Sequence, residues 1–335
     1  MNRQFAIIGC GSIAKRHAEQ ICRVGKLVAV CDIDREKSIN FAQQYKARAY
    51  QNLEVLLNEE KDLSVISICS PNHLHAEHSI QCLRASKHVL CEKPLCLHPF
   101  DADAMISAAK EAGRKLWIVK QNRYNPLIIG LKQLLQNGHL GNITSFQVNC
   151  FWNRPDSYFL QSNWKGKRAL DGGPLYTQFS HFIDLLIWLL GDISILSTTT
   201  ANLQHPLLEI EDTGMALLQS SNSSIGSLHY TLNAAERNME GSITLFGTKG
   251  TIKVGGQYLN KLDYISPGIE LNDLSPVNSP NDYGFYQGSM SNHDIVYDKL
   301  TEELDTGTNL LPDAVEGAKS VSWIYKFYSS SKITL

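Results

Sequence analysis

The stretch from Phe5 to about Lys120 constrains the fold most, because short apolar runs alternate in it with amphipathic stretches. Strand–helix–strand units are right-handed and bring successive strands together in parallel, so this alternation predicts a parallel sheet with helices between its strands. We expect strands at 5–9, 27–32, 65–69, 87–91 and 116–120, with a short one near residue 49. We expect helices at 13–24, 36–45, 53–58, 76–85 and 99–112, the last ended by Gly113.

A different pattern begins after residue 121, which we take as the boundary between a first domain, 1–121, and a second, 122–335. A helix at 127–137 precedes alternating or β-rich segments at 143–152, 194–204, 212–219, 224–232, 241–246 and 251–254. These segments predict a large, mainly antiparallel sheet. Further helices are expected at 175–190, 294–306 and 313–330. The fold class is therefore α/β, with an α+β second domain.

The second sheet has two faces, and helix 175–190 can cover only one of them. A partner subunit is the simplest cover for the other, so we expect a homodimer or a homotetramer. The segment 255–291 lacks periodicity and is rich in Gly, Ser, Asn and Pro, which indicates a functional loop or a disordered one. Four tyrosines are interspersed in it: Tyr258, Tyr264, Tyr283 and Tyr286.

Composition narrows the range of partners. The 335 residues are enough for two cores, and 31 basic residues nearly balance 33 acidic ones. Without a basic run, we expect small molecules as partners, and neither nucleic acid nor a membrane. We recognise no signal peptide, and the most apolar run, 182–190, is too short to span a bilayer, so we expect a cytoplasmic protein. The eight cysteines are interpreted as buried thiols, without disulfides or metal.

A cofactor fingerprint stands at the end of the first predicted strand. Gly9-Cys10-Gly11-Ser12-Ile13-Ala14 is a G-x-G-x-x-A motif between a strand and a helix. Gly9 permits a tight turn, and Gly11 lets the backbone approach a pyrophosphate. The N–H groups at the helix start, at Ser12 and Ile13, then face the phosphate charge.

Asp32 completes this fingerprint. It ends the next strand, 23 positions after Gly9, where a carboxylate that binds a ribose hydroxyl is expected about 20 residues on. A carboxylate repels a 2′-phosphate, so the pattern predicts a Rossmann domain that binds NAD in preference to NADP, although Arg35 would soften this preference. The alternative is a Rossmann-like domain without a cofactor.

Polar residues also follow the strand at 65–69, in the run Ser70-Pro71-Asn72-His73-Leu74-His75. Ser70 and Asn72 would lie at the carboxyl edge of the sheet and suit the nicotinamide ribose. His75 begins the next helix, and we assign all three to cofactor binding. His73, His75 and His78 can be read as metal ligands, but no carboxylate or cysteine completes such a site.

The run Val89-Leu90-Cys91-Glu92-Lys93-Pro94-Leu95 places a carboxylate, an amine and a proline directly after a buried strand. A parallel strand delivers such groups to the edge of the sheet where ligands bind. Pro94 excludes helix at Lys93 and is compatible with a cis peptide, so the ammonium group is directed. Lys93 is therefore a candidate catalytic residue; the alternative is a solvated turn lysine.

A second candidate lies beyond Asp171-Gly172-Gly173, on the apolar helix 175–190. At helical spacing, Thr177, His181 and Asp184 share one edge of that helix. A lone histidine on an apolar helix is usually structural. The glycine pair permits close approach of a ligand or of another chain segment, which raises the case for a functional His181.

These motifs together resemble those of the Gfo/Idh/MocA oxidoreductases over nearly the whole chain. They are the Gly9 fingerprint, the run 69–75, Glu92-Lys93-Pro94, and the glycine pair followed by His181-Phe182-Ile183-Asp184. The resemblance implies that Lys93 and His181 face the reacting carbon, and that Glu92 lies near the nicotinamide. Family members usually carry an aspartate four residues before the histidine. This chain has Thr177 there, so His181 needs another orienting group.

Shorter motifs are similar to one branch of this family, which oxidises the 3-hydroxyl of UDP-N-acetylglucosaminuronate for surface polysaccharides such as lipopolysaccharide. They are the runs 121–126, 149–154, 164–166 and 177–181. The likeness implies cofactor contact for Gln121 and substrate contact for Arg123, Tyr124, Arg154, Trp164, Lys165, Thr177 and His181.

The residue types agree with an anionic nucleotide sugar independently of that likeness. Trp152 and Tyr158 could stack on a uracil. Four cations could meet a diphosphate and a carboxylate: Arg154, Lys165, Lys167 and Arg168. The alternative interpretation is that these aromatic side chains belong to the core and that the cations are solvated.

The predicted reaction is the NAD-dependent oxidation of a secondary sugar hydroxyl held between Lys93 and His181. We favour His181 as the base, because an unperturbed histidine pKa of about 6.5 needs little change. Other possibilities are a dehydrogenase of a free sugar or inositol, an NAD-using glycosidase, and a non-catalytic NAD(H) sensor.

Overall fold

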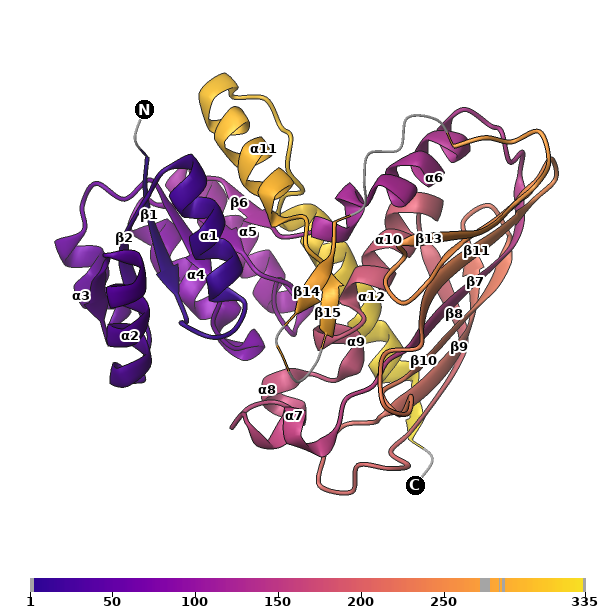
Figure 1. Ribbon diagram of the computed structural model, residues 1–335, viewed down its shortest axis with the longest axis horizontal. Coiled ribbons are helices and arrows are strands. Elements are labelled where there is room, and N and C mark those ends of the chain that lie inside the picture. The colour runs from indigo at the N-terminus through magenta and orange to yellow at the C-terminus, as the bar shows by residue number, and fades with distance from the viewer. Residues whose placement is uncertain (1–2, 272–277, 283, 285–286, 334–335) are drawn as a thin grey trace. The chain divides into compact units, whose positions relative to one another are not determined.

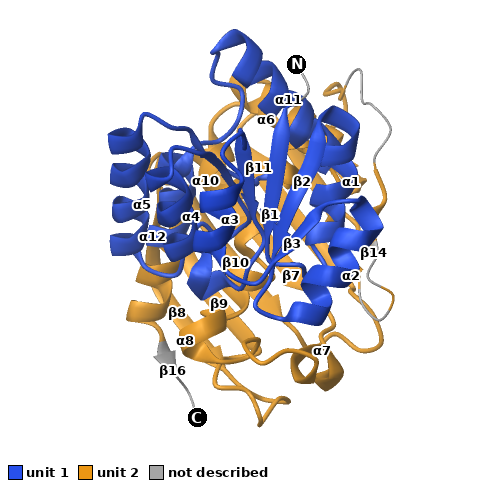
Figure 2. Ribbon diagram, turned by 90° about the vertical axis from the view of Figure 1, so that its left-hand side faces the viewer, with its two compact units in different colours: residues 1–120, 293–322 blue, residues 121–292, 323–335 orange. Residues whose placement is uncertain are grey.

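The computed structural model describes residues 3–271, 278–282, 284 and 287–333. The chain divides into two compact units, blue and orange in Figure 2. Unit 1 comprises Met1–Lys120 and His293–Ser322, and unit 2 comprises Gln121–Asn292 and Trp323–Leu335. The division near residue 121 is as expected. The expectation that all of 122–335 forms the second domain is wrong for 293–322.

Unit 1 contains a six-stranded sheet in the order β3-β2-β1-β4-β5-β6, with every neighbouring pair parallel. Its strands are β1 (Gln4–Ile8), β2 (Lys26–Cys31), β3 (Arg48–Tyr50), β4 (Val65–Ile68), β5 (His88–Cys91) and β6 (Leu116–Ile118). This is the strand order of a Rossmann fold, and ligands bind such sheets at the carboxyl ends of the strands. The predicted parallel sheet is confirmed.

The helices of unit 1 begin and end where local sequence signals place them. They are α1 (Ala14–Val24), α2 (Arg35–Tyr45), α3 (Leu53–Glu59), α4 (His75–Arg84), α5 (Pro99–Ala112), α11 (His293–Thr306) and the first part of α12 (Ala314–Ser330). Asp34 and Asn52 accept backbone N–H bonds at the starts of α2 and α3. Gly113, with φ +59°, ends α5 as predicted.

Helix α11 belongs to unit 1 because of how it packs. Val296, Tyr297 and Leu300 are fully buried, and the Tyr297 ring lies 6.1 Å from that of Phe5 on β1. The helix runs along α1. Apolar burial of this kind is non-directional and depends on contact rather than on position in the chain.

Unit 2 contains an eight-stranded sheet in the order β13-β12-β11-β7-β10-β9-β8-β16. Its strands are β7 (Ile143–Phe151), β8 (Ile193–Ala201), β9 (Thr213–Ser220), β10 (Ile225–Thr231), β11 (Glu240–Gly247), β12 (Thr251–Gly255), β13 (Lys261–Ile265) and β16 (Lys332–Ile333). The mainly antiparallel sheet is confirmed. Two pairs, β7 with β10 and β8 with β16, are parallel.

The described parts of 255–291 are ordered rather than a single loop. Strand β13 extends the large sheet, and β14 (Pro280–Asp282) pairs with β15 (Gln287–Met290). Tyr258 is buried and Tyr264 is exposed. Tyr283 and Tyr286 lie outside the described residues.

Among the described residues, one face of the large sheet is covered and the other is open. Helix α10 (Ser180–Leu190) lies against the sheet (Figure 1). Phe182 on this helix packs on Trp152 at 6.0 Å between ring centroids. The exposed face carries paired residues of neighbouring strands, among them Met215, Leu217 and Ile225. Apolar and polar side chains alternate because successive residues of a strand point to opposite faces.

The remaining helices of unit 2 connect these strands. They are η2 (Gln121–Tyr124), α6 (Pro126–Gln136), α7 (Asp156–Leu160), α8 (Arg168–Asp171), α9 (Pro174–Thr177) and the end of α12. In the part of the chain that the structure describes, no helix combines the length and the apolar character that crossing a membrane requires. All eight cysteines lie in that part and are unpaired.

Candidate active site

The glycine fingerprint forms the turn between β1 and α1. Gly9 has φ +92°, and a β-carbon there would lie 2.6 Å from the Cys69 carbonyl oxygen, so the position requires glycine. A β-carbon at Gly11 would meet no heavy atom of the described residues within 4 Å. Gly11 and Ser12 are exposed and Ile13 is half-buried. The backbone at the start of α1 is therefore open to a ligand such as a pyrophosphate.

Asp32 lies at the carboxyl end of β2, beside this turn. One carboxylate oxygen accepts the backbone N–H of Cys10 at 2.7 Å, and the other accepts that of Asp34 at 2.9 Å. These bonds orient the carboxylate, and each oxygen has lone-pair capacity left for a ribose hydroxyl. The predicted pairing of the turn with the acidic residue is thus present in the structure.

The loop after β4 holds Ser70, Asn72 and His75, but it uses His75 internally. Both ring nitrogens of His75 face backbone carbonyl oxygens, Nδ1 that of Pro94 at 2.6 Å and Nε2 that of Ser70 at 2.8 Å. The ring is buried. We therefore correct the prediction of a direct cofactor contact through these nitrogens: His75 connects the loop after β4 to the loop after β5.

Glu92, Lys93 and Pro94 follow β5, and the peptide bond between Lys93 and Pro94 is cis. Lys93 is half-buried and Glu92 is buried. The backbone N–H of Lys93 donates to Glu92 Oε2 at 3.0 Å. The carboxylate of Glu92 thus holds the backbone of the residue that we predict to be catalytic.

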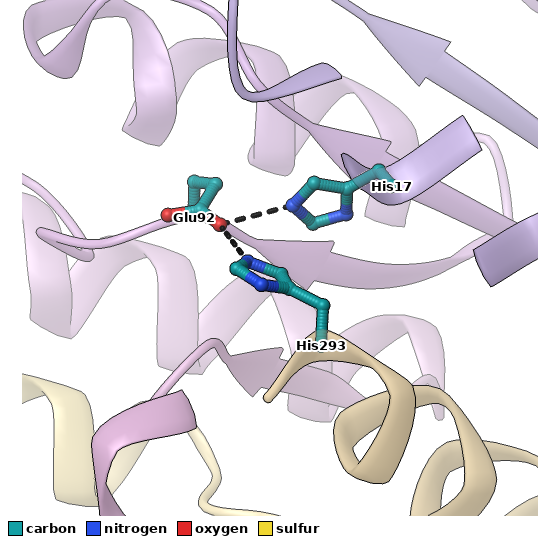
Figure 3. Close-up of side chains that lie close together, drawn as sticks. All are labelled: His17, Glu92 and His293. Carbon is teal, nitrogen blue, oxygen red and sulfur yellow. Dashed lines mark hydrogen bonds and ion pairs between the residues drawn. The ribbon is translucent and has the colours of Figure 1, made fainter. Parts of the chain in front are cut away.

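Two histidines hold the other oxygen of Glu92, as Figure 3 shows. Nε2 of His17, on α1, lies 2.9 Å from Oε1, and Nε2 of His293, on α11, lies 3.3 Å from it. Burial would raise the pKa of Glu92, but the hydrogen bonds from the two imidazoles outweigh it and hold the pKa well below its usual range. Burial lowers the pKa of His17 despite Glu92. Glu92 is therefore ionised beside a neutral His17.

The same three residues are a candidate metal centre. Their ligand atoms lie within 4.8 Å of one another, and two histidines with a carboxylate form a known ligand set for transition metals. Hydrogen bonds between the imidazoles and the carboxylate account for the arrangement without an ion. The absence of a metal stays a prediction.

In unit 2, His181 lies at the start of α10 and is buried. Its Nε2 is 3.3 Å from Nε2 of Gln121 and 3.3 Å from Oγ of Ser289. The Gln121 amide also donates to Ser289 at 3.1 Å. Gln121, which we predicted to bind the cofactor, therefore lies against the predicted catalytic histidine, together with a serine that the sequence did not single out.

The predicted stripe of Thr177, His181 and Asp184 on one helix is wrong, because the helix is broken. α9 ends at Thr177 and α10 begins at Ser180. The Thr177 hydroxyl donates to the carboxylate of Asp171, whose other oxygen accepts the Gly166 N–H at 2.7 Å. Thr177 is thus engaged with the buried Asp171.

The glycine pair that precedes this helix is explained by packing. Gly173 has φ +119°, and a β-carbon there would lie 2.5 Å from the hydroxyl of Tyr328. The close approach that the glycines permit is therefore made by a side chain of the protein, and the pair adds no support to a functional His181.

Arg123 forms a buried ion pair with Asp184. Its Nε and one terminal nitrogen each lie 2.8 Å from an oxygen of Asp184, and the guanidinium is 5.3 Å from the centre of the Trp188 ring. Such a two-bond fork matches a carboxylate closely. This pair ties η2 to α10, and the substrate contact of Arg123 stays a prediction. Tyr124, beside it, is half-exposed.

The predicted uracil stack is also wrong. Trp152 and Tyr158 are 2% and 4% exposed, so their rings belong to the core. Arg154, itself buried, lies 5.0 Å from the centre of the Trp152 ring and donates to the Asn153 carbonyl at 2.6 Å. Arg154 thus packs against the core, and its substrate contact stays a prediction.

Among the predicted cations of this region, Lys165 is the best candidate to bind an anionic ligand. It is half-buried, with Nζ 3.8 Å from the centre of the Tyr158 ring. Burial lowers the pKa of Lys165 to about 8, against the attraction of Asp171. Trp164 is half-exposed, and Lys167 and Arg168 are exposed.

The structure gathers the predicted residues into one group in each unit. In unit 1 the carboxyl ends of β1, β2, β4 and β5 carry Gly9, Gly11, Ser12, Ile13, Asp32, Ser70, Asn72, His75, Glu92 and Lys93. In unit 2 the group is Gln121 with His181. Sequence reasoning missed His17, Ser289 and His293, and a histidine eight residues after Gly9 was the one available signal for the first of them.

Two family profiles match the chain. One, described as "Oxidoreductase family, NAD-binding Rossmann fold", matches residues 3–120. The other, described as "GFO/IDH/MocA C-terminal domain", matches residues 128–253. Together they span the parallel sheet of unit 1 and most of the large sheet of unit 2.

Two solved structures are similar to almost the whole chain. The WlbA dehydrogenase from Bordetella pertussis, in complex with NADH and UDP-GlcNAcA, is 31% identical with a TM-score of 0.88; the match covers 98% of this chain and 96% of that one. The WlbA dehydrogenase from Chromobacterium violaceum, in complex with the same molecules, is 32% identical with a TM-score of 0.89, covering 98% and 93%.

A curated relative points to a different sugar. Glucose-6-phosphate 3-dehydrogenase of Bacillus subtilis is 29% identical over 215 residues, which are 63% of this chain and 60% of the relative. The chain thus matches less than two thirds of the length of such relatives.

Proposed function

The chain belongs to the Gfo/Idh/MocA oxidoreductase family, and on this premise we propose that it is an NAD-dependent dehydrogenase of the C3 hydroxyl of UDP-N-acetylglucosaminuronate. The observation that carries the proposal is the similarity, over 98% of the chain, to two dehydrogenases solved with NADH and UDP-GlcNAcA. The product would be a 3-keto nucleotide sugar for surface polysaccharides such as lipopolysaccharide.

The residues of unit 1 fit an NAD cofactor, which accepts the hydride when bound. Gly11 leaves room beside the start of α1, and the first turn of that helix carries Lys15 and Arg16, whose charge favours a pyrophosphate. Asp32 is oriented for a ribose hydroxyl and disfavours a 2′-phosphate, so NAD is preferred over NADP. Ser70 and Asn72 stay candidates for the nicotinamide ribose.

In our proposal, His181 and Lys93 act on the hydroxyl. His181 Nε2 removes the proton, and the ammonium of Lys93 stabilises the alkoxide that develops as hydride leaves. Gln121 and Ser289 support the role of His181, because N–H and O–H donors beside Nε2 favour the tautomer with an unprotonated Nε2. The convergence of Lys93 and His181 on one substrate stays a prediction.

We assign Lys165 to an anionic group of the substrate. A half-buried ammonium whose pKa has fallen to about 8 regains a favourable partner when a carboxylate or diphosphate binds, so binding stabilises the charged form. Trp164 and Tyr124 stay candidates for substrate contact.

A second candidate is a dehydrogenase of a free sugar or sugar phosphate. The glucose-6-phosphate 3-dehydrogenase favours it. This second function requires the same oxidation of a C3 hydroxyl. It differs from the first in the anionic group that Lys165 would bind.

The assembly that we propose is a homodimer or homotetramer in a reducing compartment such as the cytoplasm. The open sheet face exposes Met215, Leu217, Ile225 and Phe246, at 45%, 55%, 57% and 42%, and a partner subunit would remove this apolar area from water. A monomeric mass by light scattering would contradict the proposal.

The function is tested with the full chain, NAD and a panel of sugars, by nicotinamide absorbance. We expect the highest kcat/KM with UDP-N-acetylglucosaminuronate. UDP-N-acetylglucosamine is the matched control, because it differs only in carrying a hydroxymethyl group in place of the carboxylate. Preference for glucose 6-phosphate would establish the second candidate, and no turnover of any sugar would refute the enzyme.

Substitution tests the two catalytic assignments. Lys93→Ala and His181→Ala should each lower kcat by about 10²–10⁴-fold with NAD affinity retained, as expected for acid–base groups. Lys165→Met should instead raise KM for the uronate with a smaller change in kcat. Near-normal kcat in both alanine variants would refute the roles.

A further inference from the structure

We infer that His17, His293 and Tyr297 are positioning residues that fix the loop bearing Lys93 by holding Glu92 in place. The inference rests on the proposed function for the role of Lys93. These three side chains come from α1 and α11, outside the run that follows β5.

The carboxylate of Glu92 is held at both ends. Oε1 accepts hydrogen bonds from Nε2 of His17 and from Nε2 of His293, and Oε2 accepts one from the backbone N–H of Lys93. All three side chains are at most 3% exposed. A buried carboxylate is costly unless such donors replace water, so the donors also determine where the Glu92 side chain can lie.

The proton arrangement of this network has one consistent form. Because an ionised carboxylate only accepts, His17 carries its proton on Nε2, and Nδ1 accepts from the Tyr297 hydroxyl at 2.8 Å. Tyr297 in turn accepts from Ser67 on β4, also at 2.8 Å. The chain Ser67–Tyr297–His17–Glu92 therefore connects the centre of the sheet to the loop after β5.

His293 enters from a distant part of the sequence, 201 residues after Glu92. It begins α11 and is the first residue of unit 1 after the chain leaves unit 2. Its Nδ1 is buried without a hydrogen-bond partner among the described residues. The bond to Glu92 is thus the polar contact that the described chain provides for this imidazole.

Loss of one donor should displace the carboxylate, and with it the Lys93 backbone. Displacement of a reacting group by about 1 Å can cost about 10²-fold in rate.

The experiment compares His293→Leu, which removes the donor, with His293→Gln, which places an amide N–H near the position of Nε2. We expect kcat to fall about 10–100-fold in the first variant and to recover in part in the second. Tyr297→Phe removes only the hydroxyl and keeps the ring packing, so it should lower kcat by a smaller factor than His293→Leu. It tests the same network if the His293 variants fail to fold.

Glu303→Gln is the matched control. Glu303 is also buried on α11 and accepts the Trp117 indole N–H at 2.9 Å, so its variant perturbs the docking of the same helix away from Glu92. It should lose stability while kcat stays unchanged. Equal loss of kcat in Glu303→Gln and His293→Leu would overturn the inference, as would an unchanged kcat in His293→Leu.

A readout that needs no turnover separates this inference from the proposed function. The rate at which acetic anhydride labels Lys93, measured by mass spectrometry with the exposed Lys46 as the internal reference, should change several-fold in His293→Leu and not in Glu303→Gln. If this holds while no sugar is oxidised, the positioning role stands and the proposed function fails. Stoichiometric zinc or another transition metal in the purified protein, lost with activity in EDTA, would overturn the hydrogen-bond network in favour of a metal centre.

Discussion

Glu211 offers a test of the reasoning on buried charge, because its carboxyl lies in the core of unit 2 between two tyrosines. The hydroxyls of Tyr230, on β10, and Tyr328, on α12, donate to the same oxygen at 2.8 Å and 2.6 Å. Burial raises the pKa of Glu211 to about 7, against these bonds and the charge of Arg168, which lower it. Both tyrosines have pKa values raised well above their usual range and stay neutral at the pH considered.

Between about pH 4.5 and pH 7, the folded protein therefore keeps a proton on Glu211 that the unfolded chain has already released. The stability contributed by this proton is present below the unfolded pKa and is lost as pH rises through the folded one. A shift from 4.5 to about 7 corresponds to about 3 kcal/mol, at about 1.4 kcal/mol per unit. Glu211→Gln removes the titration, so the free energy of unfolding of the variant minus that of the wild type should rise by about 3 kcal/mol from pH 4.5 to 8.

The assay is urea unfolding followed by tryptophan fluorescence at several pH values. Any constant cost of the new amide cancels, because only the change of the difference with pH is used. Glu209→Gln, at an exposed position two residues away, is the matched control for removal of a charge. A difference between wild type and Glu211→Gln that stays constant across this pH range would refute the reasoning.

Three further substitutions test the turn and the ion pair. Gly9→Ala should destabilise the fold, because the backbone there has φ +92° and the new β-carbon would lie 2.6 Å from the Cys69 carbonyl oxygen. Gly11→Ala should instead leave thermal stability unchanged and weaken NAD binding, measured by calorimetry. Unchanged NAD affinity in Gly11→Ala would argue against the cofactor turn. Asp184→Ala should lower the free energy of unfolding by about 3–5 kcal/mol, since it leaves the buried Arg123 guanidinium without its carboxylate, and a loss below about 1 kcal/mol in urea unfolding would contradict this.

Much of the fold was predictable because the signals are local. The predicted strand near residue 49 is β3, and Gly113 ends α5 as expected. Such features depend on a few neighbouring residues, through caps, turns and periodicity. The break between α9 and α10 was missed because the run from Leu175 to Leu190 contains no glycine or proline that would mark the interruption at Gln178 and Phe179.

The candidate site was predictable where its residues follow strands of the parallel sheet. Gly9, Asp32 and Glu92 each come directly after a strand, and the carboxyl ends of parallel strands share an edge. The environments of Trp152, Tyr158 and Arg154 were not predictable, because an aromatic or cationic side chain in a loop is compatible with both a surface and a core. Their burial is a property of what packs around them.

The sequence by itself determined the class of each sheet, the cofactor turn and the residues that begin and end most helices, since these depend on spacing along the chain. Only the tertiary structure decided that His17 and His293 meet at Glu92, that Arg123 is paired with Asp184, and that α11 packs with the first unit. The contacts at Glu92 join residues that lie up to 201 positions apart, and no local pattern encodes which distant side chain will satisfy a buried charge.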